Sequence, residues 1–190
     1  MTRIDRTMPW LVFPPAVDLA NTVVVTAGGP VDLLTTDDEL AAWAALERGR
    51  IPGVEATAGR LVEVRALRDD VRDLLFAAAD GRPLASASVA AVNAASAGAL
   101  SYPVLHEDYG IDEILIGDDT FARFRSAIAR SAIAVLAGDD RQRLDVCHAP
   151  SCGMLFLRRG GAQKWCCDAC GNRARVASHA RRHRAGARSG

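Results

Sequence analysis

Apolar side chains recur at helical spacing along most of the first 138 residues. The longest such stretch, residues 56–79, repeats them at i, i+3 and i+4, as on a helix face that packs into a core. Residues 120–137 show the same period, after a capping aspartate at position 118 or 119 and before Gly138. These two segments are predicted to be the main helices of the chain.

Three shorter segments are also predicted to be helical. Residues 16–25 place apolar side chains on one face. Thr36 and Glu39 form a capping box that opens a helix extending to about residue 46. An alanine-rich helix is expected over residues 86–97.

At residues 100–106 and again at 111–116, the spacing of apolar side chains shortens to the two-residue period of a β-strand. The acidic turn Glu107-Asp108-Tyr109-Gly110 separates the two runs, so they are predicted to form a hairpin. The first 15 residues contain three prolines and are expected to be irregular, with apolar side chains that dock on the helices. Residues 1–138 are therefore expected to form a mainly α, helical N-terminal domain with one small β-hairpin.

Composition favours a chain with a sizeable core that stays outside the membrane. Apolar residues make up 49% of the sequence, but no run approaches the roughly 18 residues that suggest a membrane span. The N-terminus has too short an apolar patch for a secretory leader, and it lacks a small-residue cleavage site. We therefore expect a cytoplasmic protein, where its thiols stay reduced.

A net charge of zero conceals two oppositely charged parts. Residues 1–140 hold 12 Arg against 21 Asp and Glu, a formal charge of −9. Residues 141–190 hold 10 Arg and one Lys against two Asp, a formal charge of +9. Such asymmetry suggests a polyanionic partner for the C-terminal part, although attraction between the two oppositely charged halves would also account for it.

All five cysteines lie in the last quarter of the sequence, in two close-spaced groups. Cys147 and Cys152 form the first, and Cys166, Cys167 and Cys170 form the second. Two thiol pairs from separate segments supply the four soft ligands that Zn²⁺ takes at tetrahedral corners. The sequence therefore predicts a zinc site.

The segment between the two groups is short and apolar. Residues 154–157 are predicted to be a strand, 158–161 a turn and 163–165 a returning strand, followed by a helix that carries the second thiol pair. This order is that of a treble-clef-like zinc finger. With the domain boundary placed at Gly138, the finger spans residues 139–190.

Five thiols compete for four ligand positions. Cys166 and Cys170 share a helix face at i and i+4, which favours Cys166 and leaves Cys167 as a spare thiol; Cys167 and Cys170 at i and i+3 remain an alternative. His148 is too close to Cys147 to reach the same ion easily. A disulfide cluster is the less favoured reading, because an odd cysteine would remain.

The sequence around these thiols resembles a known family. Trp165-Cys166 and Cys170-Gly171-Asn172-Arg173 are similar to the signature of the CGNR zinc-finger family, whose bacterial members carry the finger behind a helical ABATE domain. Those members are labelled stress-induced transcription regulators. Asp18-Leu19-Ala20-Asn21-Thr22 is similar to a segment of the ABATE domain. Many members have four residues between the last two cysteines, whereas this chain has three if Cys166 is the ligand, which leaves the choice with Cys167 open.

Four thiolate ligands leave no coordination site for a reactive water, so the predicted zinc is structural. The helix after Cys170 is rich in arginine, and its charges spread around the helix as on a surface that follows phosphates. One of them, Arg173, is close enough to Cys170 to support the metal site instead. The predicted nucleic-acid-binding residues are Arg173, Arg175, Arg181, Arg182 and Arg184.

Two function classes fit these observations. The first is a DNA-binding transcriptional regulator whose helical body senses a small molecule or forms a homodimer. The second is a protein–protein interaction module whose basic finger docks on an acidic surface. An enzyme is not expected, because no paired carboxylates, nucleophile triad or open metal site is present. Asn21 could cap a neighbouring backbone or, with Arg68, form a ligand pocket for an anion.

Overall fold

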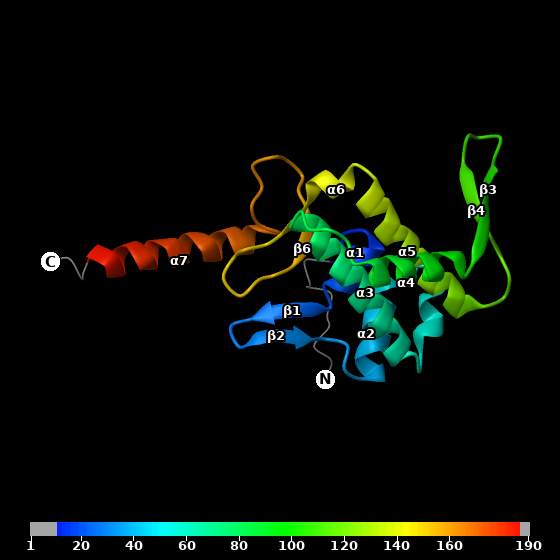
Figure 1. Cartoon of the computed structure of the whole chain (residues 1–190), viewed down its shortest axis with the longest axis horizontal. Helices are drawn as coiled ribbons and strands as arrows, with labels where there is room; N and C mark the ends of the chain where they lie inside the picture. The colour runs from blue at the N-terminus through cyan, green and yellow to red at the C-terminus, as the bar shows by residue number, and fades with distance from the viewer. Residues whose placement is uncertain (1–10, 187–190) are drawn as a thin grey trace.

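The computed structural model describes residues 11–186, and most of the predicted irregular N-terminal segment lies outside this range. Helices dominate the described part, with three two-stranded antiparallel sheets (Figure 1). The mainly α prediction is confirmed. The elements in chain order are α1 Pro15–Ala20, β1 Val23–Thr26, β2 Gly29–Asp32, α2 Asp37–Glu47, the 3-10 helix η1 Val54–Thr57, α3 Leu61–Ala79, α4 Ser86–Ala97, β3 Leu100–Leu105, β4 Ile111–Ile116, α5 Thr120–Ala137, α6 Asp140–Arg143, β5 Leu144–Val146, β6 Leu155–Leu157 and α7 Asp168–Gly186.

The short helix α1 lies at the centre of the body and packs against both α3 and α5. Five of its six residues are buried, because apolar side chains surround it on all sides. Its neighbours complete the core: Trp43 of α2 meets Phe124 of α5 edge to face, with ring centroids 6.3 Å apart. Gly53 lets η1 approach α5 closely, since a Cβ there would lie 2.3 Å from the carbonyl oxygen of Thr120.

The helix predicted over residues 16–25 is wrong in its second half. The chain leaves the helix at Asn21, and Val23–Thr26 pairs with Gly29–Asp32 as a hairpin. The Thr22 hydroxyl donates to the Leu19 carbonyl at 2.7 Å and closes the helix end. A run of β-branched residues follows, whose stiff side chains favour a strand. The body therefore has two hairpins where one was expected.

The long predicted helix also begins later than expected, at Leu61 of α3 instead of residue 56. A 3-10 turn and Gly59, which has a positive φ of 68°, precede it. The other predicted body elements agree closely with the structure. The Thr36 hydroxyl accepts from the Glu39 amide at 3.2 Å, as a capping box requires.

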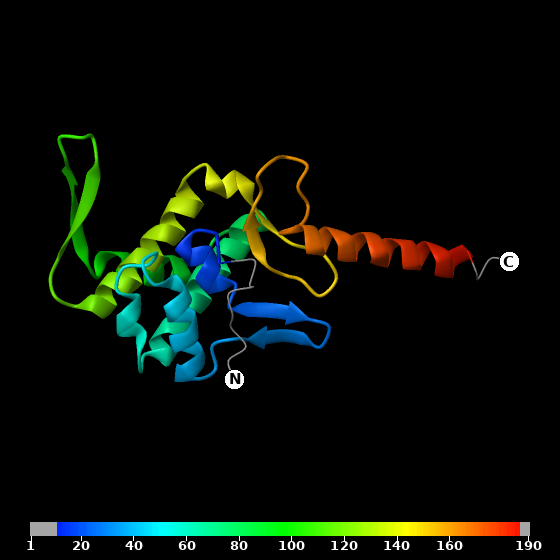
Figure 2. The same ribbon diagram turned by 180° about the vertical axis from the view of Figure 1, so that it is seen from behind.

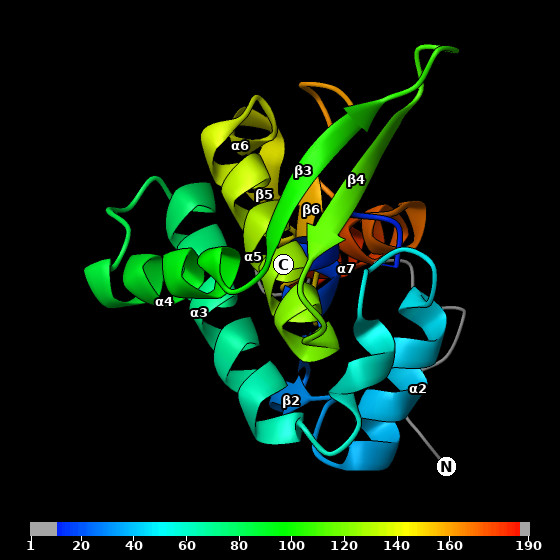
Figure 3. The same ribbon diagram turned by 90° about the vertical axis from the view of Figure 1, so that its right-hand side faces the viewer.

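The β3–β4 hairpin projects from the helices as a separate two-stranded ribbon (Figure 3). It lies at one end of the molecule, and α7 projects from the other end (Figures 1 and 2). Several large apolar side chains of this ribbon face solvent, among them Leu105, Tyr109 and Ile111 at 74%, 92% and 70% exposure. In the described part of the chain, no helix is long and apolar enough to cross a membrane.

The first strand of the finger belongs to the core of the body. β5 and β6 form a short antiparallel ladder, and Leu144, Leu155 and Leu157 pack in the same cluster as the buried side chains of α3 and α5. The predicted partner strand at residues 163–165 is therefore wrong: β6 pairs with β5, and residues 163–165 are irregular. The finger thus shares packing with the body and does not form a separate lobe.

Two buried carboxylates lie close together, one in α1 and one at the end of α2. Asp18 and Glu47 are fully buried, and their oxygens lie 2.9 Å and 2.6 Å from the guanidinium of Arg50. Burial, and then the charge of Glu47, raise the pKa of Asp18 to about 8. Asp18 also accepts a hydrogen bond from the Phe13 amide at 3.1 Å, so this carboxylate holds the start of the described chain against the body.

We expect Asp18→Asn to flatten the pH dependence of stability. The raised pKa means that the folded chain keeps a proton that the unfolded chain releases above its ordinary pKa of 3.8. The stabilisation is therefore complete below about pH 4 and is lost as the pH rises towards 8, by roughly 2–5 kcal/mol. Urea unfolding between pH 6 and 9 with saturating zinc measures the slope.

Asp80→Asn is the matched control, because it neutralises a carboxylate that is 49% exposed. It should keep the slope of the natural sequence. Any pH dependence of the zinc thiolates is common to all three chains and cancels in the comparison. An Asp18→Asn slope equal to that of the natural sequence would contradict the prediction.

Candidate metal centre

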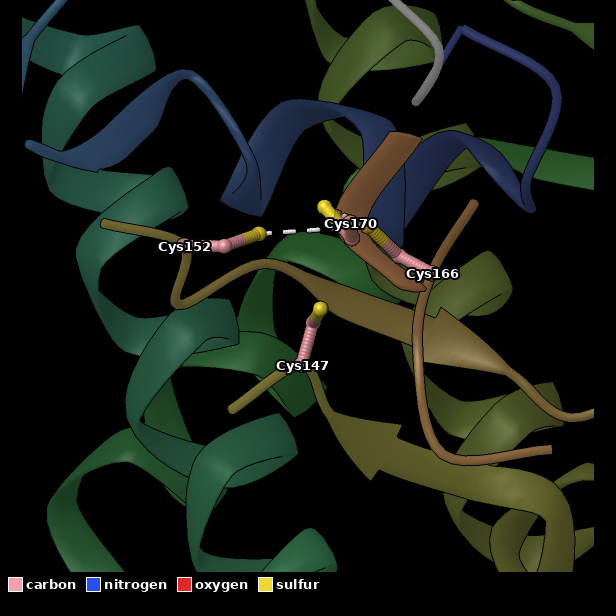
Figure 4. Close-up of side chains that lie close together, drawn as sticks. All are labelled: Cys147, Cys152, Cys166 and Cys170. Atoms are coloured by element: carbon pink, nitrogen blue, oxygen red, sulfur yellow. Dashed lines mark hydrogen bonds between the residues drawn. The ribbon is translucent and has the colours of Figure 1, made fainter. Parts of the chain in front are cut away.

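Four cysteine sulfurs converge at the junction of β5, β6 and α7 (Figure 4). Cys147 directly follows β5, and Cys152 lies in the loop that returns to β6. Cys166 precedes α7, and Cys170 lies in its first turn. The sulfurs of these four residues all lie within 4.8 Å of one another.

Local hydrogen bonds fix the loop that carries the first pair. The Cys147 amide donates to the Met154 carbonyl at 2.9 Å and extends the β5–β6 ladder by one step. The Cys152 amide donates to the Ala149 carbonyl at 2.9 Å, and Ser151 takes a positive φ of 56° to close the turn. The backbone therefore presents both sulfurs on the same side.

The spacing of the sulfurs fits a tetrahedral ion. Four sulfurs held at ~2.3 Å from a central Zn²⁺ lie about 3.8 Å from one another. The sulfurs of Cys152 and Cys166 are 3.8 Å apart, and those of Cys166 and Cys170 are 3.4 Å apart. Cys147 and Cys170 are buried, and Phe156 packs against both.

Without a cation these four thiols cannot ionise together. Hydrogen bonds from Cys152 and Cys166 lower the pKa of the Cys147 thiol to about 2. Burial raises the pKa of Cys170 to about 12, and hydrogen bonds to Cys147 and Cys152 raise that of Cys166 further. A divalent ion at the centre would remove this divergence, since metal binding deprotonates every coordinating thiol.

Two neighbouring residues lie around the cluster. The guanidinium of Arg173 donates to the sulfur of Cys170 at 2.9 Å, which raises the pKa of Arg173. Cys167 lies outside the set of four, with its sulfur 4.0 Å from that of Cys166. This placement favours Cys166 over Cys167 as the third metal ligand.

The remaining predicted nucleic-acid residues lie along α7, which extends away from the body (Figures 1 and 2). Arg175, Arg181 and Arg182 are exposed. Arg175 donates to the side chain of Asn172, and Arg181 donates to the Ser178 hydroxyl at 3.1 Å. Arg184 lies on the same helix. These residues share one element but do not converge on a point.

Asn21 and Arg68, the predicted ligand pocket, each have partners within the protein. The Asn21 amide nitrogen donates to the Leu155 carbonyl, and its oxygen accepts from the Leu155 amide, both at 2.9 Å. Arg68 forms two hydrogen bonds to Asp32, at 2.6 and 2.9 Å. No contact between Asn21 and Arg68 is present among the described hydrogen bonds, so the pocket remains a prediction that these contacts do not support.

The hydrogen bonds between Asn21 and Leu155 confirm the alternative that Asn21 caps a neighbouring backbone, although the sequence did not identify Leu155 as its partner. Leu155 opens β6 of the finger, one residue after the Met154 carbonyl that accepts from Cys147. Asn21 therefore pairs with β6 as a neighbouring strand would, and it joins α1 to the cysteine cluster. The alternation of Leu144, Asp145 and Val146 before the first cysteine was the signal for the missed strand β5.

Comparison with known proteins gives two family matches in succession. The model of the ABATE family, described as "Putative stress-induced transcription regulator", matches residues 14–139. The model of the CGNR zinc finger matches residues 143–183, which include all five cysteines. A search of curated proteins found no match. The cysteine cluster and the finger match together identify zinc as the bound ion.

We expect Cys166→Ser and Cys167→Ser to differ in zinc content. Removing the sulfur of Cys166 takes away a ligand that lies within 3.4 Å of Cys170, so zinc should fall from one to well below one ion per chain. Cys167→Ser should retain the full ion. Metal analysis of the purified chains after dialysis gives the stoichiometry, and the reverse order would assign the third ligand to Cys167.

Proposed function

The chain belongs to the ABATE family and carries a CGNR zinc finger, and from this premise we propose that it is a bacterial, cytoplasmic transcriptional regulator that binds DNA. In this proposal Cys147, Cys152, Cys166 and Cys170 are the zinc ligands. The metal is structural, because four protein sulfurs leave no position for a reactive water. We therefore propose no enzymatic activity. The division into a domain of residues 1–138 and a finger of residues 139–190 is part of the same proposal.

The exposed basic surface of α7 carries this proposal. Arg175, Arg181 and Arg182 face solvent, and none of them forms an ion pair with a carboxylate in the described part of the chain. The helix points away from the acidic body instead of folding onto it (Figure 1). Its charges are therefore available to a polyanion, and phosphate contacts are what arginines of this kind supply.

Zinc fixes the position of this helix. Cys166 and Cys170 hold the start of α7, and Arg173 donates to the sulfur of Cys170. A zinc ion with four thiolates carries a formal charge of −2, which the N-terminal end of a helix stabilises through its dipole. Arg173 therefore serves the metal site in this proposal, and the outer arginines serve the nucleic acid.

The β3–β4 hairpin supports a dimerising role for the body. Leu100, Tyr102, Ile114 and Ile116 lie on one face of the ribbon as two cross-strand pairs, and all four are exposed. A two-stranded hairpin is marginally stable in water unless its apolar face is covered. A second copy offers the same apolar patch, so we propose that two hairpins associate through these side chains and leave the two α7 helices at opposite ends of a homodimer.

DNA binding by α7 should depend steeply on salt. Each neutralised phosphate contributes a slope of about −0.9 to log K against log[salt]. Arg181→Gln with Arg182→Gln should weaken binding to random-sequence duplex and reduce the slope by about 2. Arg141→Gln, an exposed arginine of α6, is the matched control and should leave both unchanged.

Fluorescence anisotropy with a labelled duplex from 50 to 300 mM salt measures affinity and slope together. Salt-sensitive self-association without any DNA binding would favour the interaction-module alternative, in which the basic finger docks on an acidic protein surface. A slope that the double variant leaves unchanged would remove α7 from the interface.

Ile114→Asp should shift the chain towards the monomer. A carboxylate in the middle of the apolar face would be buried on association, which costs several kcal/mol unless it is paired. Sedimentation equilibrium at several concentrations gives the dissociation constant. Val62→Asp, in a residue of α3 that is 77% exposed, is the control and should leave it unchanged. A natural chain that stays monomeric at 100 μM would refute the hairpin interface.

A further inference from the structure

A groove lies between α7 and the loop that carries the first cysteine pair, with a volume of about 790 Å³. This size falls within the range typical of ligand sites. We call it the finger groove. Its main lining residues are His148, Trp165, Arg175, His179, Arg181 and Arg182.

The lining of the finger groove is basic and aromatic. Three of its residues are arginines, and the residues that line it within the described chain include no carboxylate. Two other uses of a basic helix explain the groove less well. A helix with a structural role alone does not require a groove beside it, and a site for an acidic peptide does not require an indole ring. Cations next to an aromatic ring are the combination that binds bases together with their phosphates.

Trp165 is the aromatic ring of this lining besides the imidazoles of His148 and His179. It also lines a second cavity of about 520 Å³ near the start of α7, together with Arg175. Gly171 allows the ring to lie against the helix, since a Cβ there would come within 3.1 Å of the indole Cδ1 atom. The Trp165 carbonyl accepts from the Gln163 side chain at 2.9 Å, which fixes the backbone beneath the ring.

We propose that the finger groove binds single-stranded nucleic acid, with a base stacked on Trp165 and phosphates on Arg175, Arg181 and Arg182. This inference rests on the proposed function and specifies its ligand. In a duplex each base is already stacked between its neighbours, so its face is not open to an indole ring. A single strand turns its bases outward, where aromatic side chains stack on them.

The second cavity gives the strand a path beyond the indole. Arg159 and Lys164 line it, next to Trp165 and Arg175, with Asp168 as its one acidic lining residue in the described chain. Because the two cavities share Trp165 and Arg175, a strand that passes from one cavity into the other stays in contact with basic side chains. The arrangement therefore suits several successive nucleotides.

The test compares a labelled 20-nucleotide single strand with its duplex by fluorescence anisotropy, using the full zinc-loaded chain. The natural chain should bind the single strand at least 10-fold more tightly at equal salt. Trp165→Leu should weaken single-strand binding about 5- to 100-fold, the effect of losing one stacked base, whereas Trp165→Phe should retain most of it. Zinc content of each variant shows whether the metal site persists.

A second pair of variants tests the groove without touching the metal site. Val176 lines the groove, whereas Ala177 is the next residue on the same helix and lies outside it. Val176→Glu should weaken single-strand binding clearly more than Ala177→Glu, although both add the same charge to α7.

The outcomes separate this inference from the proposed function. The proposed binding site in the finger groove would be overturned if the two glutamate variants had equal effects on single-strand binding. It would also be overturned if a zinc-loaded Trp165→Leu chain bound the single strand as the natural chain does. Equal or tighter binding of the duplex would also overturn it and leave the proposed DNA-binding function standing. Failure of the natural chain to bind either nucleic acid would remove both.

Discussion

The finger depends on a cation that allows closely spaced cysteine thiols to ionise side by side. Their sulfurs lie within 4.8 Å of one another, and without an ion the pKa values of Cys147 and Cys170 diverge to about 2 and about 12. Few apolar side chains pack around them, mainly Phe156 and Ala149 in the interior and Phe13 and Trp165 at its edge. A unit of this size has too little core to fold alone, so the metal supplies the missing free energy.

The metal centre is also tied to the body. Asn21 forms two hydrogen bonds with Leu155, and the side chains of β5 and β6 pack in the main core. Asn21 is fully buried, so the loss of Leu155 as a partner would leave the nitrogen and the oxygen of its side-chain amide without hydrogen bonds, at a cost of about 1–3 kcal/mol. Binding of zinc therefore stabilises more than the finger, because ordering the cysteine loop also orders the strand that Asn21 contacts.

Sequence patterns predicted the elements whose signal is local. Residues 120–137 carried their own N-cap and period, and residues 86–97 carried a high alanine content and a glycine at their end. The close approach of Cys166 and Cys170 was also predicted, although Cys166 precedes α7 and does not lie on a face of it. The pairing of β6 with β5 was not predictable, because the strand partner lies across the cysteine loop and the apolar run between the thiols fits either neighbour. The Val23–Thr26 strand was missed because its apolar residues also fitted a helical face, although its β-branched composition favoured a strand.

The charge distribution of α7 distinguishes structural from functional arginines. A helix dipole favours cations near the C-terminal end, so Arg182 has a stabilising role in α7 that needs no ligand. Arg173 has its own role at the sulfur of Cys170. Arg175 has neither role: it lies two turns into the helix, where the dipole effect has faded, and it lines both cavities beside Trp165. Its one described side-chain hydrogen bond goes to Asn172 on the same helix, so its charge is available to the anion of the proposed groove.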